Sequence, residues 1–148
     1  MTLRNVLLTL HILIAILTLG WLLIDAMVLP RAIRNGQAAV IRFAEGIAGK
    51  LGPAAGVVFL LGLWLVGRDG DDGIEFSDAW VSASMLLFIL AMVNGAVLMR
   101  RVIERAASKI EGGVDAADDA RTLSMLAGVN GVLLTVIVYL MVAKPGGY

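Results

Sequence analysis

Residues 6–29 read VLLTLHILIAILTLGWLLIDAMVL, and His11 and Asp25 are the only side chains in this run that can carry a charge. At 1.5 Å per residue, a helix of this length spans roughly 36 Å and crosses a bilayer core of about 30 Å. The apolar residues follow one another without the alternation of a membrane barrel strand. The run therefore predicts a transmembrane helix.

The rest of the chain has the same character, with 59% hydrophobic and 16% charged residues in 148. Three further apolar runs cover residues 51–67, 79–99 and 123–143. We expect a single all-α domain, an integral membrane four-helix bundle. The chain has no cysteine, which excludes disulfides and thiolate metal sites.

The basic side chains are distributed unequally between the two sides of the predicted bundle. The segments after the first and third runs hold nine of them, whereas the opposite side has only Arg4, Arg68 and Lys144. By the positive-inside rule both termini lie outside and the two longer loops lie in the cytoplasm. We expect a multi-pass membrane protein. The nine residues are Arg31, Arg34, Arg42, Lys50, Arg100, Arg101, Arg105, Lys109 and Arg121.

Both cytoplasmic loops carry helical patterns. Apolar residues between 40 and 51 recur at helical spacing, and a second apolar stripe continues beyond residue 100 until Gly112 and Gly113. Asp118 and Asp119 suit the start of the last helix, where carboxylates complement the exposed amides. We therefore expect helical extensions in both loops, and Trp80 and Tyr139 near the outer interface.

Four polar residues recur every seven positions along the first run: Arg4, His11, Thr18 and Asp25. Positions seven apart differ by only about 20° around a helix, so all four share one face. Because ionisable groups that face lipid are costly, this face is expected to point into the bundle. His11 and Asp25 are fourteen residues apart, or roughly 21 Å along the helix.

The polar stripe has three interpretations. His11 could ligate haem iron or copper with the outer methionines Met85 and Met141 or with a second subunit's His11. His11 and Asp25 could form part of a proton or ion pathway. The third interpretation is a structural stripe of satisfied polar groups, with Asp25 bound by Asn94, Asn130 or the basic inner end.

Two asparagines lie in similar apolar settings, AMVNG at 91–95 and AGVNG at 127–131. Asn94 precedes Arg100 by six residues and Asn130 follows Leu123 by seven, so the two lie at similar depth on helices that a hairpin joins. The small-xxx-small spacing around each allows a close helix approach. We expect a hydrogen bond between them, and they complete the set of polar intramembrane candidates with Thr18 and Asp25.

Several stretches together resemble a known bacterial family. They are LHILIAILTLGWLLIDAMVLPR, LGPAAGVVFLLGLWL, AW before the third helix and VYLMVAKPGG near the end. The chain resembles domain-of-unknown-function family 2269, predicted integral membrane proteins. Leu10, His11 and Gly20 carry a more distant likeness to copper-resistance D and related haem-associated membrane proteins.

Catalytic motifs such as HExxH, GxSxG or a nucleotide loop do not occur in the sequence. We therefore expect a non-enzymatic accessory or interaction subunit of a membrane assembly. Its partners would be the lipid bilayer and other membrane subunits or a second copy, not nucleic acid. A haem- or copper-binding protein that uses His11 is the alternative.

Overall fold

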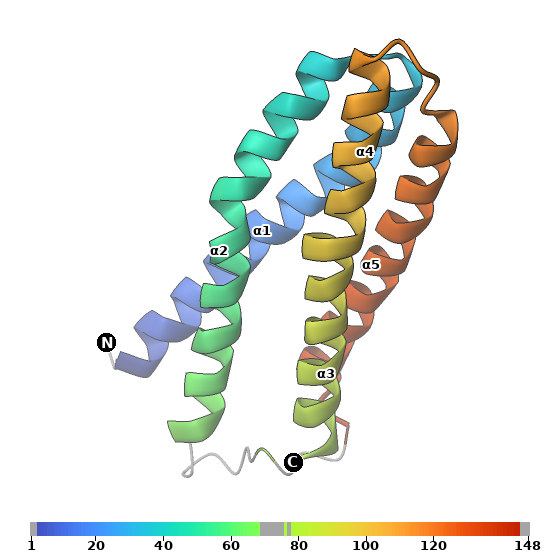
Figure 1. Cartoon of the computed structure of the whole chain (residues 1–148). Coiled ribbons are helices and arrows are strands. Elements are labelled where there is room, and N and C mark those ends of the chain that lie inside the picture. The colour runs from blue at the N-terminus through green and yellow to red at the C-terminus, as the bar shows by residue number, and fades with distance from the viewer. Residues whose placement is uncertain (1–2, 69–75, 77, 146–148) are drawn as a thin grey trace.

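The computed structural model describes residues 3–68, 76 and 78–145, and most of these residues are helical (Figure 1). No strand occurs in this described part of the chain. Four rods result, because α3, the π-helical segment η1 and α4 follow one another without a break. The elements are α1 (Leu3–Arg34), α2 (Ala38–Arg68), α3 (Ala79–Val93), η1 (Asn94–Met99), α4 (Arg100–Glu111) and α5 (Ala117–Ala143).

Each of the four rods is long and apolar enough to cross a membrane, which confirms the all-α integral membrane fold. The helices are longer than the sequence predicted. α1 runs beyond Leu29 to Arg34, and α2 already begins at Ala38. The helical pattern from residue 40 belongs to α2 itself, so the helical extensions are present. The connections themselves are short, residues 35–37 and 112–116, because most of each predicted loop belongs to these helical extensions.

Glycines in left-handed conformation form both short connections. Gly36 has a φ of 65° and Gly113 a φ of 72°, a region that a side chain makes costly. After α1, the amide of Gln37 donates to the carbonyl of Ala32 at 2.9 Å, which closes the helix end. These reversals make successive rods antiparallel. We call the end with residues 35–37 and 112–116 the turn end, and the opposite end the terminal end.

The tightest packing lies near the turn end, where all rods converge (Figure 1). Many of the buried residues are alanines, which lets the helix backbones approach closely. Within lipid there is little hydrophobic drive for helices to associate, whereas the part that emerges into water gains from burial. The core consists of Leu29, Ala32, Ile33, Ile41, Ala44, Met99, Val102, Ala106, Ala107, Ala116, Ala120, Leu123 and Ala127.

A buried carboxylate ties α4 to α5 at this end. Asp119 is only 2% exposed and accepts hydrogen bonds from Arg105 Nε and Lys109 Nζ, both at 2.6 Å. The sequence placed Asp119 in the first turn of the last helix, which is correct. Its main interaction is nevertheless with α4.

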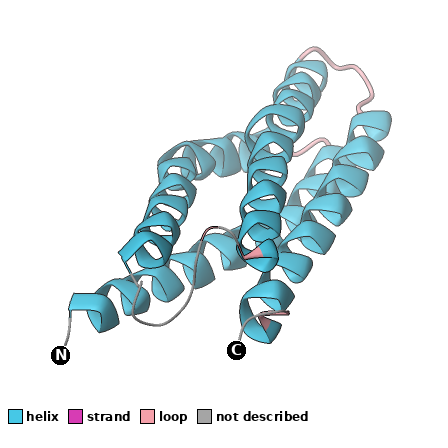
Figure 2. Ribbon diagram, turned by 90° about the horizontal axis from the view of Figure 1, so that it is seen from below, coloured by secondary structure: helices cyan, strands magenta, loops and turns pink. Residues whose placement is uncertain are grey.

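Away from the turn end the rods separate into two pairs. α1 packs along α2, and α3 packs along α5, while α1 also crosses α5. Viewed from below, the two pairs diverge (Figure 2). This divergence positions the candidate site between the pairs.

Candidate membrane cavity

A cavity of about 760 Å³ lies between the α1–α2 pair and the α3–α5 pair. In the described chain α2 packs mainly on α1 and α4, and it has no extensive packing with α3. The stacked rings of Phe59 and Phe88, with centroids 5.4 Å apart, bridge α2 and α3. Both rings also line the cavity. The volume falls within the range of about 300–1,000 Å³ that is typical of small-molecule sites.

The polar stripe of α1 faces this cavity. His11, Thr18 and Asp25 all line it, as their seven-residue spacing predicted, whereas Arg4 does not. The Thr18 hydroxyl donates to the carbonyl of Ile14 at 2.8 Å and is therefore satisfied within its own helix. His11 and Asp25 remain as the two ionisable groups that α1 presents to the cavity.

His11 is held between α1 and α2. Its Nδ1 lies 3.0 Å from the carbonyl oxygen of Val58, and because a carbonyl only accepts, Nδ1 must carry the proton of this hydrogen bond. Gly62 lies beside the ring, since a Cβ at that position would be in van der Waals contact with His11 Cε1, at 3.4 Å. In the neutral imidazole, Nε2 is then an acceptor with a free lone pair.

The two methionines that the sequence associated with His11 line the same cavity. Met85 comes from α3 and Met141 from α5, so three different rods contribute an imidazole or a thioether to one space. In the described residues no group of three or more His, Asp or Glu side chains is close enough to hold a metal ion. Any metal chemistry in this cavity would depend on His11 and the thioethers.

Asp25 is 9% exposed and also borders the cavity. The indole of Trp21, one turn earlier, approaches the carboxyl, but its Nε1 lacks a hydrogen bond of good geometry. In the described chain no hydrogen bond joins Asp25 to Asn94 or Asn130, so neither asparagine is its partner, and the basic inner end stays a prediction. A buried polar group at the cavity wall thus keeps unused hydrogen-bonding capacity.

The two asparagines do lie together, which confirms their expected pairing. Asn94 Nδ2 donates to the carbonyl of Leu126 at 2.9 Å and lies 3.4 Å from Asn130 Oδ1. The first contact is the stronger of the two, because 3.4 Å is long for a hydrogen bond. Both residues are buried, and η1 begins at Asn94. The pair links the α3–η1 rod to α5.

Trp80 differs from its sequence prediction. It was expected at the lipid interface, yet it is 8% exposed and lines the cavity. Its Nε1 has no hydrogen-bond partner in the described chain, and Lys144 Nζ lies 5.9 Å from the ring centroid. Tyr139, by contrast, is 64% exposed.

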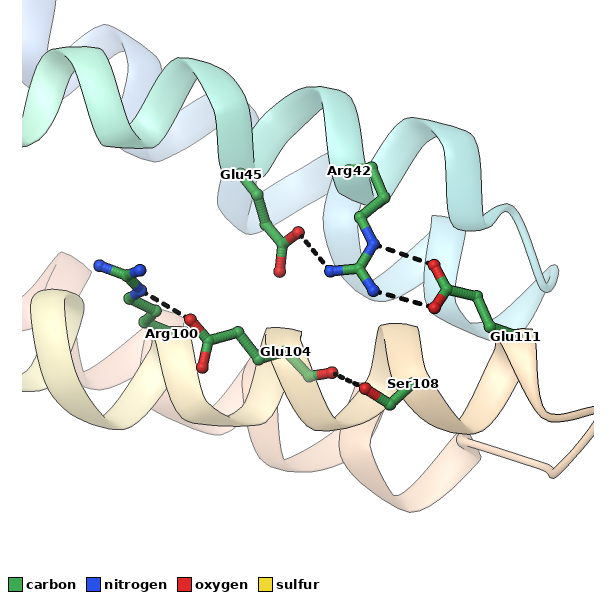
Figure 3. A network of polar contacts seen from close by, with 6 residues as sticks. All are labelled: Arg42, Glu45, Arg100, Glu104, Ser108 and Glu111. Atoms are coloured by element: carbon green, nitrogen blue, oxygen red, sulfur yellow. Dashed lines mark hydrogen bonds and ion pairs between the residues drawn. The ribbon is translucent and has the colours of Figure 1, made fainter.

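Sequence reasoning missed a charged cluster where the cavity opens near the turn end. We call Arg42, Glu45, Arg100 and Glu104 the charged mouth, and all four line the cavity. Arg42 donates to Glu45 at 3.0 Å and makes two hydrogen bonds of 2.9 Å to Glu111, which join α2 to α4 (Figure 3). The sequence pattern that could have predicted this cluster is the alternation of Arg and Glu at helical spacing.

Comparison with known proteins gives one match. The model of a family described as "Predicted integral membrane protein (DUF2269)" matches residues 5–145. The matched range includes every cavity residue named above. No curated protein and no solved structure shows a significant match.

Proposed function

Because the chain belongs to the DUF2269 family of predicted integral membrane proteins, whose description names no ligand, we propose a function from the cavity itself. We propose that the protein binds haem within the membrane, with His11 as the iron ligand. The position of His11 carries this proposal. Its Nδ1 is fixed on the Val58 carbonyl while the ring borders a cavity of about 760 Å³.

The hydrogen bond of His11 is the kind that prepares an imidazole for a metal. Histidines that ligate metals usually donate their other ring N–H to a carbonyl or carboxylate, which fixes the tautomer and increases the basicity of the free nitrogen. Val58 supplies that carbonyl, so Nε2 is the atom that would ligate iron.

The size and lining of the cavity favour haem over a copper ion. A single ion needs far less than 760 Å³, whereas a planar macrocycle needs a large apolar space. The lining is mostly apolar, and Trp80 has an unpaired buried N–H in the described chain. Met85, Met141 or His11 of a second copy are candidates for a second axial ligand, since His and Met are common haem ligands. When bound, haem would supply redox or gas-binding chemistry.

Titration of the purified full chain with haemin tests this proposal. We expect a Soret band that saturates at about one haem per chain, with quenching of tryptophan fluorescence, because Trp21 and Trp80 line the cavity. Cu(I) should compete weakly. A titration that shows no saturation, or only the unspecific partition that lipid vesicles show without protein, rejects haem binding.

A second candidate function is that of a non-enzymatic accessory subunit in a membrane assembly. The sparse packing between α2 and α3 favours this candidate, because a partner's helix could pack against both. Copper at the same residues and a proton or ion pathway through His11 and Asp25 remain weaker candidates. Chemical cross-linking in native membranes distinguishes a subunit, since it predicts a partner joined to α2 or α3 and no bound haem.

We further propose that the terminal end faces outward from a bacterial inner membrane, on the basis of the distribution of basic residues. Lys144→Cys should react with an impermeant thiol reagent on intact cells, whereas Ser108→Cys should react only after lysis. Lys144 lies beyond α5 and Ser108 lies in α4, both exposed. The reverse labelling would overturn this orientation.

A further inference from the structure

The charged mouth is only partly satisfied by its own ion pairs. Arg42 uses its guanidinium on Glu111 and on Glu45 Oε2, and Arg100 hydrogen-bonds through Nε to Glu104 at 2.8 Å (Figure 3). The second oxygen of Glu45, Oε1, is buried and has no hydrogen-bond partner in the described chain. A buried acceptor of this kind is costly unless a donor satisfies it.

The charges of the mouth balance. Arg42 and Arg100 carry two positive charges, and Glu45 and Glu104 carry two negative charges. A ligand that carries a cationic hydrogen-bond donor would satisfy Glu45 Oε1. The Nη atoms of Arg100, which make no hydrogen bond in the described residues, can bind an anionic group beside it.

The space beyond the charged mouth is apolar. The cavity continues along α2 past Pro53 and Phe59, where α2 has little packing with α3. A charged rim at the turn end and an apolar body within the membrane together match an amphiphile. An acyl chain can occupy the body while its headgroup stays at the rim.

We propose that the cavity binds a phospholipid with a primary ammonium headgroup, of the phosphatidylethanolamine type. The ammonium donates to Glu45 Oε1, the phosphate lies beside Arg100, and an acyl chain enters the cavity. Phosphatidylcholine lacks the N–H donor, and phosphatidylglycerol offers Glu45 only neutral hydroxyl donors, which bind a carboxylate less strongly than an ammonium does. The proposed site therefore discriminates between three headgroups on the same acyl chains.

This site is separate from the proposed haem ligand. Glu45 precedes Val58, the partner of His11, by thirteen residues of α2, or roughly 20 Å. The lipid proposal rests on the charged mouth and on the apolar space next to it, and it does not require haem.

Native mass spectrometry of the purified full chain tests the lipid proposal. Dioleoyl phosphatidylethanolamine, phosphatidylcholine and phosphatidylglycerol are added in equal amounts to the protein in detergent. We expect one retained phosphatidylethanolamine per chain, preferred about tenfold over each of the other two lipids. Equal retention of the three, or a preference for phosphatidylglycerol, overturns the proposal.

Two variants locate the site. Glu45→Gln should reduce the retention of phosphatidylethanolamine about tenfold, because it removes the charge that the ammonium contacts. Asp118→Asn is the matched control, since Asp118 is exposed at the turn end and does not line the cavity. Unchanged retention in Glu45→Gln, or an equal loss in both variants, contradicts the assignment to Glu45. If Glu45→Gln does not fold, the headgroup preference of the wild type still decides the proposal.

Discussion

Replacing His11 with alanine is expected to lower haem occupancy more than tenfold and to remove most of the Soret band. The imidazole is the only nitrogen ligand that the chain offers, because His11 is its sole histidine. Alanine removes Nε2 and also the hydrogen bond to Val58, so no other side chain replaces the ligand. The absorption spectrum after haemin titration measures the effect.

The control for this variant is Thr9→Ala on the same helix. Thr9 is exposed on α1, does not line the cavity and donates to the carbonyl of Asn5 at 2.7 Å, so its loss should leave haem binding unchanged. Circular dichroism and the elution volume of both variants verify the fold. If His11→Ala binds haem as the wild type does, His11 is not the ligand.

The largest effect on stability is expected at Asp119. Asp119→Ala should lower the free energy of unfolding by about 3 kcal/mol, because each lost hydrogen bond to a charged group contributes about 1.5–3 kcal/mol. Two such bonds together contribute about 3–6 kcal/mol. We expect the lower end of this range, because the side chains of Arg105 and Lys109 are 57% and 36% exposed and water can solvate them after Asp119 is lost. Denaturation in mixed micelles, followed by circular dichroism, gives this value.

Asp118→Ala is the comparison for Asp119→Ala. Asp118 is exposed in the same turn and contributes mainly through the helix dipole, so its replacement should cost less than about 1 kcal/mol. Equal losses in the two variants would mean that the link between α4 and α5 does not stabilise the bundle.

Much of the architecture follows from the sequence because membrane helices have simple requirements. The length and hydropathy of the four runs predicted the four rods, and the seven-residue spacing correctly placed His11, Thr18 and Asp25 on the cavity side of α1. The matched depth of Asn94 and Asn130 also predicted their contact. Each of these predictions depends only on the spacing of residues along one helix or on their distance from its end.

The features that sequence reasoning missed depend on how the rods tilt. Arg42 and Glu111 are 69 positions apart, and nothing in their local pattern pairs them. We expected Trp80 near the outer interface because tryptophan is common there and Trp80 is at a matching depth. In the structure, the orientation of α3 places this side chain at the cavity. The helix boundaries also moved, since α1 continues past Leu29 to Arg34. The tilt and rotation of each helix are set by its packing against the other helices. The spacing of residues along a single helix carries no information about this packing.

The visible absorption spectrum of the protein purified from the membranes of the cells that naturally make it tests the central claim most directly. Our account predicts a Soret band with about one haem per chain, established by extraction of the pigment and quantification of the protein. A folded protein that is colourless and free of haem when isolated in this way would contradict it.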